Sequence, residues 1–296
     1  MSNWLKLEGD VCAVTGALGG MGTEICREFA RNGANVVLLD LDEEKVKAAA
    51  ADLAAEFGIH AEGYKMNATD EAEVQAAVDA TIANFGRVDV LVNNAGRGII
   101  GAAEEVSDAD LREAMDLHLF VPAALVRAVL PTMREQRSGT IIQMSSQGGR
   151  VSFPGAGSYS AGKFALEGWS EALAGEVAPF GIRVMVVEPS RFRTGFNQPD
   201  VIAFAESSPV YREALSAMRA DLAQVDGVQE GDPVKAAEVI VDLAHGDDVP
   251  LRLPLGAEAV RRIGNGYRTN LEALEKWADV AIGTDFADAP QSIRPV

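Results

Sequence analysis

The sequence contains few cysteines, few histidines and few positive charges, and each shortage excludes a class of protein. Two cysteines, Cys12 and Cys26, are too few for a disulfide framework and lack the spacing of metal ligands. The three histidines are scattered along the chain, so we expect no metal site. With 26 Lys and Arg against 44 Asp and Glu, the formal charge of −18 opposes binding to the phosphate backbone of nucleic acids.

Long apolar runs are also missing. The N-terminal sequence MSNWLKLEGD has no run of signal-peptide length, and no segment approaches the roughly 18 apolar residues of a membrane span. We therefore expect a cytoplasmic protein that does not contact a membrane. Apolar residues nevertheless make up 48% of the 296 positions, which is enough for a large core, and we predict one domain over residues 1–296.

Glycine is concentrated directly after the first predicted strand. Residues 11–15 form a short apolar run, followed by Gly16, Gly20 and Gly22 and then by the apolar spacing of a helix. This order lets a pyrophosphate approach the N-terminus of a helix, where unpaired N–H groups and the helix dipole favour an anion. The spacing Gly-x-x-x-Gly-x-Gly differs from the Gly-x-Gly-x-x-Gly of the common dinucleotide fingerprint.

The second predicted strand, residues 35–39, ends at Asp40. A carboxylate there accepts hydrogen bonds from the adenosine ribose hydroxyls and repels a 2′-phosphate, so NAD is favoured over NADP. The alternative is an aspartate that only closes the strand, because aspartate favours turns. Predicted helices 43–57 and 70–85 alternate with strands at 61–66 and in the segment VDVLVNNAG. This alternation predicts an α/β fold with one doubly wound parallel sheet and helices on both faces.

Tyr159 and Lys163 lie four residues apart in the stretch SSQGGRVSFPGAGSYSAGK, residues 145–163. In a helix the two side chains share one face, and a neighbouring ammonium favours the phenolate. Ser146 follows the predicted strand TIIQM, at the end of the sheet where open parallel sheets bind ligands. Taken alone, the pair is weak evidence, and an exposed tyrosine packed on a lysine stem explains it better.

Together these motifs resemble the short-chain dehydrogenase/reductase family over roughly residues 5–195. The resemblance rests on TGxxxGxG starting at Thr15, on NNAG at residues 93–96, and on a serine followed by Tyr-x-x-x-Lys. It implies that Tyr159 is the catalytic acid/base, that Lys163 holds the nicotinamide ribose and lowers the tyrosine pKa, and that Ser146 orients the substrate oxygen. It also implies a homodimer or homotetramer, and a cofactor site formed by Thr15, Gly16, Gly20, Met21, Gly22, Asp40, Asn67, Ala68, Asn94, Ala95, Gly96, Tyr159, Lys163, Pro189 and Thr194.

Three positions depart from the family pattern. Asn67 stands where an aspartate usually contacts adenine, and Ser190 replaces the glycine of a Pro-Gly turn. His118 stands where the family has a catalytic asparagine, whose backbone holds a water of the proton relay. Either the imidazole joins this relay and titrates near pH 6 to 7, or the substitution is tolerated because only the backbone acts. We keep His118 as a candidate catalytic residue with both alternatives open.

The C-terminal third breaks the strand and helix rhythm. The resemblance implies a substrate lid over residues 195–231, whose apolar side chains suggest a partly apolar substrate, although core packing explains them equally well. Candidate substrate contacts are Gln147, Phe153 and Phe196. Residues 249–255 could form a last strand at the sheet edge, because two prolines interrupt it, before a helix over roughly 257–281 and a tail over 282–296.

The predicted activity is NAD-dependent hydride transfer that interconverts a secondary alcohol and its ketone, with a small-molecule substrate. The alternative is a dinucleotide-binding sensor or scaffold that keeps the fold without turnover. His118 and Ser190 are the features that favour this alternative, and the intact serine, tyrosine and lysine oppose it.

Overall fold

A computed structural model describes residues 7–199, 201–246, 248–286, 288 and 289. A seven-stranded parallel sheet lies at its centre in the order β3-β2-β1-β4-β6-β7-β9. The strands are β1 (Val11–Thr15), β2 (Asn35–Asp40), β3 (Ala61–Lys65), β4 (Val90–Asn93), β6 (Gly139–Met144), β7 (Ile182–Pro189) and β9 (Arg252–Leu255). The chain reverses its direction of winding between β1 and β4, which is where such sheets bind ligands.

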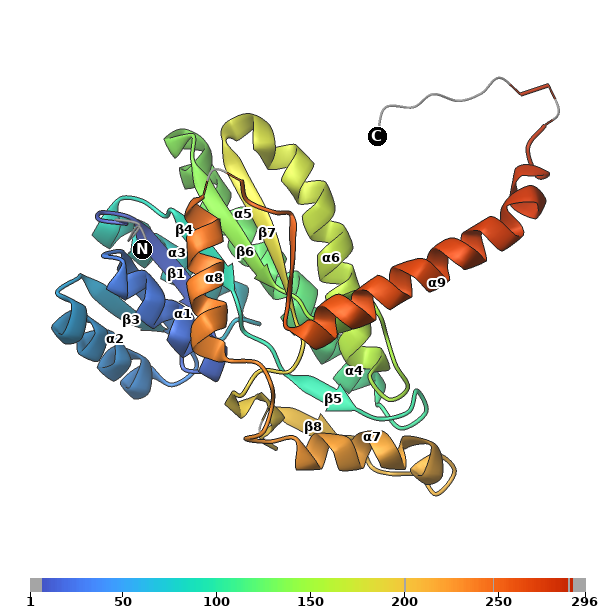
Figure 1. The fold of residues 1–296 in the computed structure, drawn as a ribbon. Helices are drawn as coiled ribbons and strands as arrows, with labels where there is room; N and C mark the ends of the chain where they lie inside the picture. The colour runs from blue at the N-terminus through green and yellow to red at the C-terminus, as the bar shows by residue number, and fades with distance from the viewer. Residues whose placement is uncertain (1–6, 200, 247, 287, 290–296) are drawn as a thin grey trace.

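Helices cover both faces of the sheet, as Figure 1 shows. Successive residues of a strand point to opposite faces, so Cys12 and Val14 enter one core cluster whereas Val11 and Ala13 enter the other. The first cluster is closed by α1 (Gly20–Arg31), α2 (Glu43–Phe57) and α8 (Pro233–His245). The second is closed by α3 (Glu71–Phe85), α5 (Val121–Gln136) and α6 (Gly157–Val177). The predicted doubly wound sheet is therefore confirmed.

The C-terminal third differs from the sequence prediction. Residues 195–231 contain a short strand, β8 (Ile202–Phe204), which pairs in parallel with β5 (Gly98–Ile100), and a helix, α7 (Arg212–Gln224). The sequence prediction missed β8, because a three-residue strand is too short to show a period. β9 does lie at the sheet edge, as its prolines predicted. The predicted tail 282–296 lies largely outside the described residues, and the division into one domain stays a prediction.

The helical run before β6 is long and apolar. It joins α4 (Asp108–Met115), a π-helical turn, η1 (Asp116–Phe120), and α5. By length and composition alone, Asp108–Gln136 could cross a membrane, because an 18-residue window within it has a mean hydropathy of 1.4. The expectation that no segment approaches a span was therefore wrong. Leu125, Val126 and Met133 from this run pack into the second core cluster. The apolar content is explained by a core helix that covers the sheet.

Four further elements complete the described chain. Three are single 3₁₀ turns, η2 (Gln147–Gly149), η3 (Ala178–Phe180) and η4 (Gly195–Asn197). The fourth is the long C-terminal helix α9 (Ala257–Ile282), which starts beside β9 and then projects away from the sheet (Figure 1).

Candidate active site

A large cavity opens at the C-terminal ends of the central strands. Its volume is about 1390 Å³, large enough for a dinucleotide and a small substrate together. Of the residues that the sequence proposed for the site, all but Gly22 and His118 line this cavity. Further lining residues come from the C-terminal third. Among them, Met218, Asp221 and Leu222 lie in the predicted lid over residues 195–231, whereas Arg262 carried no local signal in the sequence.

The glycine turn after β1 packs against the end of β4. A side chain at Gly16, which has φ 61°, would lie 2.9 Å from the Cα of Ala95, so this turn requires glycine. The Thr15 hydroxyl accepts hydrogen bonds from the backbone N–H groups of Asn94 (3.0 Å) and Ala95 (3.1 Å). The Asn94 amide donates to the carbonyl oxygens of Thr15 and Gly16, both at 3.0 Å. The NNAG segment therefore holds the glycine turn in place.

Gly22 and Gly20 serve this turn in different ways. Gly22 is buried against the Gly16 carbonyl, where a side chain would collide with backbone, so its role is packing rather than lining the cavity. A side chain at Gly20 would lie 2.6 Å from the Cβ of Thr194. The N-terminus of α1 therefore faces the cavity without a side chain at Gly20. Its unpaired N–H groups are the groups that favour a bound pyrophosphate.

Asp40 ends β2 at the rim of the cavity. Its Oδ2 accepts a hydrogen bond from the Leu18 N–H (2.9 Å) and its Oδ1 accepts one from the Leu41 N–H (2.8 Å). These two bonds fix the carboxylate between the glycine turn and the loop after β2. Asn67 lies on the same side, with its Oδ1 accepting from Thr69. A negative charge is therefore held where the adenosine end of a dinucleotide would lie.

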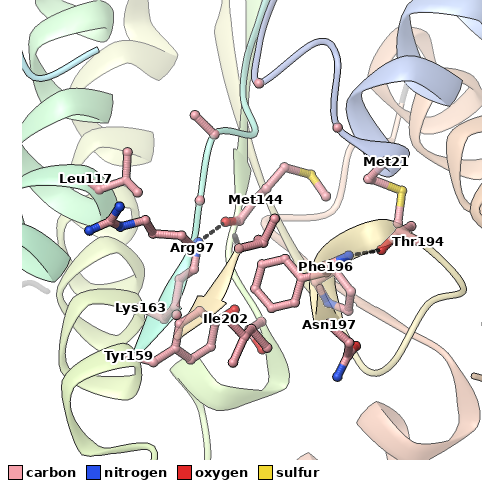
Figure 2. Close-up of a pocket in the computed structure, with 18 of the residues that line it drawn as sticks. Met21, Arg97, Leu117, Met144, Tyr159, Lys163, Thr194, Phe196, Asn197 and Ile202 are labelled. Carbon is pink, nitrogen blue, oxygen red and sulfur yellow. Dashed lines mark hydrogen bonds between the residues drawn. The ribbon is translucent and has the colours of Figure 1, made fainter. Parts of the chain in front are cut away.

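The side chains of Tyr159 and Lys163 share one face of α6, as the sequence spacing predicted (Figure 2). The Lys163 Nζ donates a hydrogen bond to the Met144 carbonyl oxygen at 2.7 Å and lies 5.8 Å from the centre of the Tyr159 ring. Lys163 is only 4% exposed. Burial lowers its pKa to about 8, against the opposing effect of Glu167.

The pKa of Tyr159 corrects the sequence expectation. Burial raises this pKa above its ordinary value of 10, and contact with the Ser146 hydroxyl acts in the opposite direction. We expected Lys163 to lower the pKa, but its ammonium is bound to the Met144 carbonyl and is itself desolvated. The cost of placing a phenolate in a buried position therefore exceeds the attraction of the cation. Ser146 lines the cavity next to this phenol, and its Oγ accepts from the Gly148 N–H at 3.0 Å.

His118 lies in the π-helical turn η1, behind the tyrosine rather than in the cavity. Its ring meets that of Tyr159 edge to face, with centroids 5.3 Å apart. A side chain at Gly162 would lie 2.8 Å from its Nδ1, so glycine makes room for the imidazole. Burial first, and then the charge of Lys163, lower the pKa of His118 well below its ordinary value of 6.5, although the Arg97 carbonyl opposes this shift. The imidazole is therefore neutral at pH 7, and a titration near pH 6 to 7 is not expected.

Ser190 adopts an ordinary backbone conformation. Among the described residues, Arg137 is the single non-glycine position with positive φ, so the turn after β7 does not require the glycine that the family commonly has. The Ser190 hydroxyl packs against Gly256, where a larger residue would collide with it. The replacement of the usual glycine by Ser190 therefore does not strain the backbone of this turn.

Apolar side chains close the side of the cavity opposite the glycine turn. Phe153, Phe196, Met218 and Leu222 pack around a small cluster of Ile100, Ala156 and Ile202. Figure 2 shows Phe196 and Ile202 beside Tyr159, and the Phe196 and Tyr159 rings are 6.2 Å apart. Gln147 also lines this end, and its buried Oε1 has no hydrogen-bond partner among the described residues. A substrate here would meet an apolar wall with a few polar groups.

Comparison with known proteins identifies the family. The family model described as short chain dehydrogenase matches residues 10–202. The chain belongs to the short-chain dehydrogenase family. This short-chain dehydrogenase is similar over 93% of its length, and over the whole of that chain, to a short-chain dehydrogenase structure from Streptomyces avermitilis, with 41% identity and a TM-score of 0.85. It is thus a Rossmann-type nucleotide-binding oxidoreductase.

Two other relatives bear on the chemistry. The D-threitol dehydrogenase of Mycolicibacterium smegmatis is 38% identical over 62% of this short-chain dehydrogenase and 71% of its own length. A metagenomic short-chain oxidoreductase solved in complex with NADP is 28% identical, with a TM-score of 0.67 over 84% of this chain and 98% of that one. The relatives support an enzyme that acts on CH–OH groups of small molecules with a nicotinamide dinucleotide.

Proposed function

We propose that this short-chain dehydrogenase interconverts a secondary alcohol and its ketone with NAD, using Tyr159 as general acid/base. The observation that carries the proposal is the convergence of Ser146, Tyr159 and Lys163 at one end of a cavity whose other end is formed by the glycine turn and Asp40. The bare glycine turn and the helix N-terminus fit a dinucleotide. When bound, the nicotinamide supplies hydride transfer to or from the substrate carbon.

Each of the three residues has a distinct task at the substrate oxygen. Ser146 holds the oxygen through its hydroxyl, and the Tyr159 hydroxyl gives a proton to the ketone or takes one from the alcohol. The high pKa of Tyr159 keeps the phenol protonated in the free protein, which suits the donation of a proton. Lys163, fixed by the Met144 carbonyl, orients the ribose and supplies positive charge below about pH 8. Such positioned proton transfer contributes about 10² to 10⁴ in rate.

The preference for NAD follows from the position of Asp40. Its carboxylate is held by two backbone N–H groups, so it cannot easily turn away from a ligand. An adenosine 2′-phosphate would bring a second negative charge against it, in a site where charges are partly desolvated. The relative that holds NADP is a different protein at 28% identity, and its cofactor is a property of that protein.

The substrate end favours a compound with both apolar and polar parts. Phe153, Phe196 and Met218 offer an apolar surface, whereas Gln147 offers an unpaired carbonyl oxygen that could accept a hydrogen bond. We therefore propose a secondary alcohol with an apolar substituent and a hydrogen-bond donor near the reacting carbon. A cytoplasmic location and a homo-oligomer remain part of the proposal.

The test is NADH formation from a panel of secondary alcohols, with Tyr159→Phe as the diagnostic variant. We expect turnover in wild type, and in Tyr159→Phe a loss of about 10² to 10⁴ in kcat with NAD binding retained. Tyr64→Phe is the matched control, because Tyr64 lies on β3 and its hydroxyl accepts from Asn84 away from the cavity. Tight NAD binding without turnover of any alcohol or ketone would instead favour the sensor or scaffold alternative.

A further inference from the structure

The C-terminal helix α9 is anchored to the rest of the protein at its start. Ala259 and Ile263 are buried, and Gly266 packs against Val151 so closely that a side chain there would lie 2.6 Å from a valine methyl. The helix has 26 residues and is therefore about 39 Å long. Figure 1 shows its second half projecting away from the sheet. That half is open to a partner.

One face of α9 carries large apolar side chains, most of them in the projecting half. The first of them, Tyr267, lies in the anchored half, where the Arg150 guanidinium covers one side of its ring at 5.2 Å and the other side stays open. At 3.6 residues per turn, Tyr267, Leu271, Leu274 and Ile282 form one stripe, and Trp277 borders it. Their exposed fractions are 49%, 54%, 67% and 67%, with 59% for the tryptophan. Tyr267 and Leu274 are seven residues apart, the spacing by which paired helices present apolar residues to each other. A patch of this kind marks an interaction site.

The charges that flank this stripe change sign along the helix. Arg261 and Arg268 lie in the N-terminal half, whereas Glu272, Glu275 and Asp279 lie in the C-terminal half, and all five are exposed on the same side of the stripe. A partner that fits this pattern must carry acidic groups opposite the first half and basic groups opposite the second. The same helix, turned end to end, has that pattern.

We propose that α9 pairs with α9 of a second copy of this chain in antiparallel orientation, about a two-fold axis near Asn270. In that orientation Tyr267 of one copy faces Leu274 of the other, and Arg268 faces Glu272. The two-fold axis repeats each contact, so one register satisfies both the apolar and the charged pairs. A parallel pair would instead set these charges on opposite sides of the interface, where they could not pair with each other.

The charge also favours a second copy over a membrane surface. Helices that lie on membranes carry Lys and Arg on their polar face and are attracted to anionic lipids. The projecting half of α9 is mainly acidic, and the whole chain has a formal charge of −18. An anionic surface would repel it. The pairing does not depend on the proposed chemistry of the active site.

The first test measures the molar mass of the full chain by analytical ultracentrifugation over a range of concentrations. Leu274→Glu should raise the dissociation constant of the pairing by roughly 10²- to 10⁴-fold, because two leucines per dimer lose their burial. Val280→Glu is the matched control: Val280 is 64% exposed on the opposite face of α9 and should leave the mass unchanged. Circular dichroism of both variants checks that the helix is retained.

The second test addresses the orientation. Arg268→Glu and Glu272→Arg should each weaken association, and the double variant or an equimolar mixture of the two single variants should restore it. A monomeric wild type, an unchanged mass in Leu274→Glu, or equal dissociation by Val280→Glu would overturn the proposal. So would a monomer that co-sediments with phosphatidylglycerol vesicles, which would assign the stripe to a membrane.

Discussion

Replacing Lys163 by methionine should change how the stability of the free protein depends on pH. Lys163 is buried on α6, and its Nζ is held by the Met144 carbonyl. Burial lowers its pKa from the ordinary 10.5 to about 8. The folded protein therefore binds this proton less tightly than the unfolded chain does, and folding carries a cost wherever the unfolded chain is protonated.

The size and direction of this effect follow from the two pKa values. A difference from 10.5 to about 8 corresponds to roughly 3 kcal/mol. Below about pH 8 both states are protonated, and the full cost is present. Between about pH 8 and 10.5 the unfolded state binds more protons, so the free energy of unfolding of the wild type should rise with pH by up to roughly 3 kcal/mol. Methionine has no proton to lose, so Lys163→Met should lack this rise.

Urea denaturation of the cofactor-free protein between pH 7 and 10 measures the effect as a difference between the two curves. The lost hydrogen bond to Met144 lowers the free energy of unfolding of the variant by the same amount at every pH. It therefore shifts the whole curve without changing its slope. Lys276→Met is the control, since Lys276 is exposed on α9 and its curve should parallel the wild type. If the Lys163→Met and wild-type curves run parallel from pH 8 to 10, the argument that burial controls this lysine is refuted.

Three further predictions concern single side chains. Asp40→Ala should shift the ratio of NAD to NADP dissociation constants toward NADP by at least roughly tenfold, measured by titration with both cofactors. His118→Asn should change kcat by less than about tenfold and leave the pH profile below 7 unaltered, because the imidazole is already neutral there; a loss of about 10² to 10⁴ would assign it to the proton relay. Glu188 is buried beside Glu167, and its pKa is raised to about 7. Because the folded state then holds the proton more tightly, stability should fall between about pH 4.5 and 7, and Glu188→Gln should abolish that fall in urea denaturation.

The parts of the structure that the sequence predicted well are those that local pattern controls. Helix 43–57 has the predicted bounds because Asp42 caps its start and Gly58, with φ 70°, ends it. The central strands are short apolar runs between turn signals, and their alternation with helices leaves few possible topologies. Residues that follow these strands line one cavity because parallel strands end at one edge of the sheet, and their roles there stay a prediction.

The parts that the sequence missed depend on contacts between distant segments. β5 and β8 are three-residue strands that exist through their pairing with each other, across about a hundred residues of chain. Arg262 reaches the cavity because the start of α9 lies beside it, which no local period encodes. The tyrosine pKa was predicted in the wrong direction for a related reason: the spacing of Tyr159 and Lys163 was visible, but the burial that outweighs it was not.

The two substitutions that raised the sensor or scaffold alternative are each accommodated by a glycine on another element. His118 packs where Gly162 leaves space on α6, and Ser190 packs where Gly256 leaves space before α9. Neither residue has a positive φ, and neither substitution displaces Lys163 from its bond with the Met144 carbonyl. A change that is packed in this way leaves the geometry of the tyrosine, serine and lysine intact. We infer that these departures do not argue for loss of turnover. The kinetic test of Tyr159→Phe therefore decides between an enzyme and a sensor or scaffold.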